Sequence, residues 1–98
     1  MDILQNLHFN EDKPATLVLG HSDKQQTIAI GLQKGQVLKK HMSATPAMIV
    51  VLKGAIKFEM EGEVTEIEEL NSFQIPPAVP HEVSGIAESI FLLIKDKA

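Results

Sequence analysis

The sequence predicts a single all-β domain. Six short apolar stretches recur along its 98 residues, at 16–19, 27–32, 48–52, 56–60, 72–75 and 89–94. Glycine, proline and small polar residues separate these stretches at close intervals, which is typical of a β-sandwich or a β-barrel. The length suits one domain covering residues 1–98, because so short a chain does not sustain two hydrophobic cores.

The individual strands follow from the spacing of apolar residues. At 27–32 and 56–60 large apolar side chains occupy every second position, as they do on a strand with one buried face. Phe73 and Ile75 alternate with polar neighbours in the same way. The stretch 48–52 has no polar member, so both of its faces should be covered and it is predicted to be a central strand.

Two further segments are interpreted from their charge and their position in the chain. Six glutamates lie between Glu59 and Glu69, and we interpret them as a solvated hairpin rather than a cation site, because the alternation directs most of them outward. The tip of this hairpin is predicted at 61–63, where Gly62 supplies the positive φ of a tight turn. Residues 2–9 are predicted to form either a short helix or a strand.

Composition excludes several classes of protein. The chain has no cysteine, so disulfides and thiolate chemistry are absent. Nine lysines and no arginine stand against thirteen acidic residues, and the net charge of −4 disfavours nucleic acid and anionic membranes as partners. No secretory signal and no apolar run of transmembrane length occurs, so a cytoplasmic location is expected.

Two blocks of sequence carry the strongest functional signal. The first, about 35–54, contains Gly35, His41 and Gly54, and the second, about 70–85, contains Pro76 and His81. Their order, spacing and intervening strands resemble the two motifs of the cupin family of RmlC-like proteins. The resemblance implies an all-β, double-stranded β-helix (jelly-roll) barrel, with His41 and His81 near the barrel mouth.

The chain departs from the cupin pattern at the metal ligands. The family's second histidine falls on Ser43 and its glutamate on Ala47, while two glycines of the second motif fall on Leu70 and Ala78. Catalytic metals usually have at least three protein ligands, and here only His41 and His81 match. No catalytic residue is assigned.

The predicted site is therefore a pocket in the barrel. Positions 41 and 43 are expected on one face of a strand, with His81 approaching from another strand across the barrel mouth. A few polar groups in an apolar cavity are typical of a ligand pocket. We predict that its lining comprises His41, Ser43, Ala47, Ile49, Phe58, Phe73 and His81.

Three functions remain open. The first is a small-molecule-binding or sensing cupin in which His41, Ser43 and His81 orient the ligand. The second is a metal-dependent enzyme, resembling cupin dioxygenases or isomerases, that holds iron, manganese, nickel or zinc through His41 and His81. The third is a self-associating structural domain with a vestigial pocket. Cupin epimerases of nucleotide-linked sugars use a tyrosine acid, and this chain has no tyrosine.

The chain is also expected to form a homodimer. Exposed apolar strand faces in so small a domain favour a partner subunit. The resemblance to small cupins permits sheet-to-sheet packing with exchange of the N-terminal segment. His8 and His21 are interpreted as surface residues.

Overall fold

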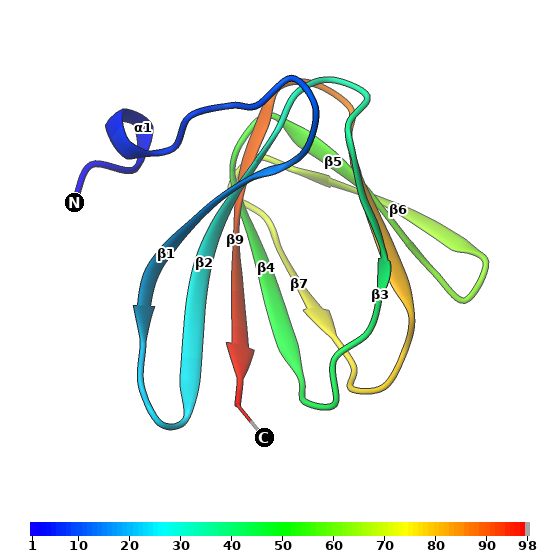
Figure 1. Cartoon of the computed structure of the whole chain (residues 1–98). Coiled ribbons are helices and arrows are strands. Elements are labelled where there is room, and N and C mark those ends of the chain that lie inside the picture. Colours follow the sequence, from blue (N-terminus) through cyan, green and yellow to red (C-terminus); the bar gives the residue numbers. More distant parts are fainter. Residues whose placement is uncertain (98) are drawn as a thin grey trace.

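The computed structural model describes residues 1–97 and is all-β apart from one helical turn, α1 (Ile3–Asn6) (Figure 1). Nine strands follow in order: β1 (Ala15–His21), β2 (Gln25–Leu32), β3 (Val37–His41), β4 (Ala47–Lys53), β5 (Ala55–Met60), β6 (Glu63–Glu68), β7 (Ser72–Ile75), β8 (His81–Gly85) and β9 (Ser89–Asp96). The predicted fold class is confirmed. All six predicted apolar stretches lie within strands.

The strands form two antiparallel sheets. The larger sheet has the order β1-β2-β9-β4-β7, and the smaller has the order β3-β8-β5-β6. Strand β9 pairs with β2 on one side and with β4 on the other. Strand β4 pairs with β7 on its second side, so it has a hydrogen-bonded neighbour along both edges. The prediction that 48–52 forms a central strand is therefore confirmed.

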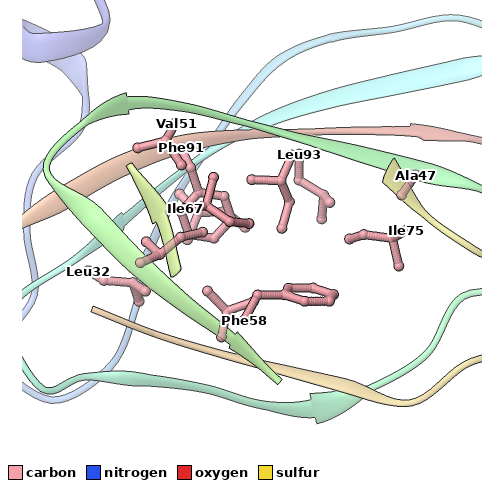
Figure 2. Close-up of a cluster of buried hydrophobic side chains, with 12 residues drawn as sticks. Leu32, Ala47, Val51, Phe58, Ile67, Ile75, Phe91 and Leu93 are labelled. Carbon is pink, nitrogen blue, oxygen red and sulfur yellow. The ribbon is translucent and has the colours of Figure 1, made fainter. Parts of the chain in front are cut away.

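The two sheets enclose one main hydrophobic core. Period-two alternation sends the large side chains of each strand inward, and Phe58, Phe91 and Ile49 are each at most 1% exposed. Figure 2 shows this cluster extending from Leu32 at one end to Ala47 and Ile75 at the other. Because hydrocarbon side chains fill the middle of the barrel, any space for a ligand has to lie near an end.

The acidic segment forms the predicted hairpin. Strands β5 and β6 pair from Ala55 opposite Glu68 to Met60 opposite Glu63, with the turn at residues 61 and 62. Glu61 and Gly62 both adopt positive φ, of 53° and 77°. The hairpin extends beyond the barrel (Figure 1), and its six glutamates are exposed. Only Ile67 of β6 is buried.

The N-terminal segment lies on the outer face of the larger sheet. Leu7 is buried and Phe9 half-buried, and their side chains come so close to Gly31 of β2 that a Cβ there would meet both at 3.1–3.2 Å. With Ala29 and Ile90 they form a second, smaller apolar cluster. Of the two alternatives for this segment, the helix is observed, as the single turn α1.

Candidate functional site

His41 and His81 meet as a directly opposed pair. Strands β3 and β8 are antiparallel neighbours, and their register places His41, the last residue of β3, opposite His81, the first residue of β8. The ring centroids are 4.4 Å apart and the ring planes are inclined by 63°. The expectation that His81 approaches across the barrel mouth is wrong, since both residues belong to the same sheet.

Hydrogen bonds fix the orientation of both imidazoles. Nδ1 of His41 lies 2.9 Å from the carbonyl oxygen of Lys39, and Nδ1 of His81 lies 3.1 Å from that of Val79. A carbonyl oxygen only accepts, so Nδ1 carries the proton in each ring. In the neutral form each Nε2 is consequently an acceptor or a ligand atom with a free lone pair.

His81 is buried, whereas His41 is exposed. The side chain of His81 is 3% exposed, and its ring stacks on Phe58 with centroids 5.3 Å apart. Burial lowers the pKa of His81 below its ordinary value; the hydrogen bond to Val79 opposes this, and the charge of His41 adds to the lowering. His81 is therefore neutral at pH 7, with Nε2 unprotonated.

A small cavity of about 120 Å³ lies beside the two imidazoles. Among residues 1–97 no buried side-chain nitrogen or oxygen lacks a hydrogen-bond partner. Since the protein engages only Nδ1 of His81, its Nε2 retains contact with accessible space, and His81 is one of the residues that line this cavity. Its lining comprises His41, Met42, Ser43, Ala47, His81, Leu93 and Lys95.

Ser43 lies at the cavity but not on a strand. Strand β3 ends at His41, so Ser43 belongs to the loop before β4, and the expectation that positions 41 and 43 share a strand face is wrong. The Thr45 hydroxyl donates to the carbonyl of Asp96, so in the 3.2 Å pair of hydroxyls Ser43 donates to Thr45. Ser43 Oγ also accepts from the Thr45 N–H. Its hydroxyl proton is thus unavailable to a ligand.

Three predicted lining residues lie deeper than the cavity. Ile49 and Phe58 belong to the buried core, and Phe73 packs against that core. Phe58 is in contact with the site through its stacking on His81, and Phe73 packs against Phe58 at 4.8 Å between centroids. Alternation correctly placed these side chains inside the barrel, but it does not reveal how far the core extends along the barrel axis.

Lys95 is a cavity residue that the sequence reasoning missed. It lies in β9 opposite Ala47 of β4, and it follows Phe91 and Leu93 at every second position, so it faces the barrel interior. It is half-buried and lines the cavity. The signal was the continuation of the alternating pattern of 89–94 by one charged residue.

The donor set does not fit a resident metal. Within residues 1–97 no group of three or more histidine, cysteine, aspartate or glutamate side chains is placed to hold a metal ion. Ala47 lines the cavity without a donor atom, and Lys95 brings a positive charge to the same space. His8 and His21 are exposed and do not join the site. Two imidazoles are fewer than the three protein ligands usual for a catalytic metal.

Two motif positions show why the family pattern has glycine. Leu70 and Ala78, which replace those glycines, adopt left-handed backbone conformations with φ of 64° and 61°. The N–H of Ala78 donates to the carbonyl of Ser43 at 2.7 Å, which joins the loop before β8 to the loop after β3. This contact holds the approaches to both histidines together.

The two-sheet antiparallel barrel and the opposed histidine pair at its end are the features expected of a cupin. The model of the cupin domain family matches residues 29–94, which covers both motifs and runs from the middle of β2 to residue 94 in β9. The chain therefore belongs to the cupin family, as the motifs predicted. No curated protein matches the chain. No helix within residues 1–97 is long and apolar enough to cross a membrane.

Solved structures share the fold at low sequence identity. An RmlC-like cupin protein from Desulfovibrio desulfuricans aligns with a TM-score of 0.89 at 20% identity, over 98% of this chain and 93% of the other. KdgF from Halomonas sp. aligns with a TM-score of 0.87 at 16% identity, over 100% of this chain and 91% of the other. A protein of unknown function from Streptococcus pyogenes aligns with a TM-score of 0.87 at 22% identity, over 100% of this chain and 86% of the other. At these identities the likeness shows the fold alone.

Proposed function

We propose that this cupin binds a small molecule in the cavity beside His41 and His81, as a binding or sensing protein. The observation that carries the proposal is the presentation of two imidazoles, each fixed by its Nδ1–H, at one cavity. Pre-oriented polar groups bordering an apolar space are what a specific pocket requires.

The surroundings of the pair support binding rather than core packing alone. Buried polar groups are normally hydrogen-bonded to protein or to ordered water, so an imidazole nitrogen without a protein partner is open to a bound molecule. Nε2 of His81 has no protein partner, although the side chain is buried. Apolar contacts would come from Leu93 and Ala47, which also line the cavity.

Ligand-induced stabilisation tests the proposal. A ligand that binds only the native state at ten times its Kd adds about 1.4 kcal/mol, which raises the Tm of a domain this size by at least about 5 °C. We expect a member of a broad panel of small metabolites to produce this shift. The shift should be lost in His41→Ala and retained in His21→Ala, an exposed histidine outside the site.

Two results of this experiment would contradict the proposal. If a ligand shifts the Tm of the wild-type chain and of His41→Ala equally, it binds elsewhere. If no panel member shifts the Tm and none perturbs the imidazole resonances of His41 or His81, the cavity is vestigial and the chain is a self-associating structural domain.

A further inference from the structure

The charges around the cavity are unbalanced. Lys95 is the one charged side chain among its lining residues, and no carboxylate accompanies it. The salt bridge found within residues 1–97 joins Lys53 to Glu88, away from this space, so Lys95 has no carboxylate partner in the described chain. A half-buried lysine that lines a cavity without a carboxylate beside it favours an anionic occupant.

The opposite side of the cavity offers acceptors. His41 and His81 direct their Nδ1–H groups to backbone carbonyls, which leaves both Nε2 atoms to accept hydrogen bonds when neutral. The hydroxyl proton of Ser43 is given to Thr45, so the serine adds no donor. A ligand that satisfies this side needs an O–H or N–H group of its own.

The volume limits the size of the ligand. The cavity measures about 120 Å³. Because an engineered apolar cavity of about 150 Å³ holds the six carbon atoms of benzene, the ligand here should have about five or six non-hydrogen atoms. Leu93 and Ala47 provide apolar surface for a short carbon body.

Resting on the function proposed above, we infer that the ligand is a small hydroxycarboxylate. Its carboxylate pairs with Lys95, and its hydroxyl donates to Nε2 of His81 or His41. The cation from the larger sheet and the acceptors from the smaller sheet face one space, so the ligand bridges the two sheets at the barrel end.

Three probes of the same carbon skeleton separate the two contacts. Lactate has both groups, propionate lacks the hydroxyl, and 1,2-propanediol lacks the carboxylate. Each is titrated into ¹⁵N-labelled protein while the imidazole nitrogen resonances are followed. We expect lactate to shift the Nε2 resonances of His41 and His81, with a Kd at least tenfold lower than that of either analogue.

Variants assign each contact. Lys95→Gln should weaken lactate and propionate at least tenfold and leave propanediol unchanged, while Lys24→Gln, which removes an exposed lysine from the β1–β2 turn, should leave all three unchanged. His41→Gln should weaken lactate more than propionate. Because His41 is exposed, this variant is expected to fold, whereas a change at buried His81 carries more risk.

The outcomes distinguish this inference from the proposed function. If propanediol binds as tightly as lactate, or if Lys95→Gln binds lactate like the wild type, the hydroxycarboxylate assignment is overturned while small-molecule binding stands. If none of the three binds but another compound shifts the His81 resonances, the assignment is also overturned. If no compound shifts them, both fail.

Discussion

The ring of Phe58 lies under the imidazole of His81, with 5.3 Å between the centroids and 23° between the planes. This contact belongs to the apolar surroundings that bury His81 and lower its pKa, an effect to which the charge of His41 adds and which the Val79 carbonyl opposes. The histidine is thus held neutral where the core meets the cavity.

Stability should therefore depend on pH through His81. Because the pKa of His81 is lower in the folded chain, the unfolded chain binds the proton more readily, and folding loses stability as pH falls below about 6.5. Urea unfolding at pH 7.5, 6.5 and 5.5 measures this loss. His81→Phe keeps an aromatic ring on Phe58 and should show a weaker pH dependence.

The control for that experiment is His21→Gln, which removes an exposed histidine and should keep the wild-type pH dependence. Identical pH profiles for the wild type and His81→Phe would show that the burial of His81 does not govern stability in this range.

Metal binding should appear only when the missing ligands are supplied. The Ser43→His/Ala47→Glu double variant restores the family's donors beside His41 and His81. We expect this variant to take up roughly one equivalent of Zn²⁺ or Ni²⁺, as a site with four protein donors does. Elemental analysis after dialysis against metal compares it with the wild type, which should retain little.

Lys95 supplies a further control, because it lies opposite residue 47 and would pair with the new glutamate. Adding Lys95→Gln to the double variant should strengthen metal binding. Stoichiometric metal in the wild-type chain that disappears in His41→Ala/His81→Ala would instead favour the metal-dependent enzyme.

Replacing Ala78 by glycine should stabilise the chain. Its φ of 61° lies in the left-handed region, where an L-residue with a Cβ is strained and glycine is not. We expect Ala78→Gly to raise the free energy of unfolding by about 0.5–1 kcal/mol, measured by chemical denaturation. Leu70→Gly, with φ of 64°, should act in the same direction.

Ala87→Gly is the matched control, since residue 87 is not among the described residues with positive φ. There the added backbone freedom of the unfolded chain should lower stability. A loss of stability in Ala78→Gly as large as in Ala87→Gly would contradict the role of strain at residue 78.

We also propose that the chain forms a homodimer through the outer face of the larger sheet. Two neighbouring cross-strand pairs, Val50 with Leu92 and Met48 with Ile94, alternate with inward residues and are half-buried in the single chain. Val50→Glu should convert a dimer to a monomer in sedimentation velocity. Val64→Glu, on exposed β6, should leave the dimer intact.

A monomeric wild-type chain at micromolar concentration would contradict this proposal. This dimer does not require exchange of the N-terminal segment between subunits, because Leu7 and Phe9 pack over Gly31 of the same chain. Deleting residues 1–6 should leave a dimer of the sheet-to-sheet kind intact.

The apolar stretches predicted six of the nine strands, and the two motifs predicted the family, because both are local patterns. Alternation identified the core face of β5, and two spaced blocks identified the cupin motifs around His41 and His81. The register between β3 and β8 is a tertiary property, so it was not predictable that these histidines would be directly paired. Lys95 was missed because a charged residue ended the apolar run that defined its strand.

The role of Ser43 illustrates the same limit. Its spacing from His41 matched a ligand position, but the direction of its hydroxyl proton depends on Thr45 and on the carbonyl of Asp96, which lies more than fifty residues away. Hydrogen-bond partners at such separation follow from the closed barrel and not from any motif.

The position of β9 has a consequence for how the polypeptide is made. This strand is the last of the nine in chain order, yet it lies between β2 and β4 in the larger sheet. On the ribosome, the emerging β1–β2 hairpin and the β4–β7 pair have no strand to join them until residues 89–96 leave the exit tunnel. Such non-local pairing slows folding, and it leaves unpaired strand edges exposed to chaperones during translation.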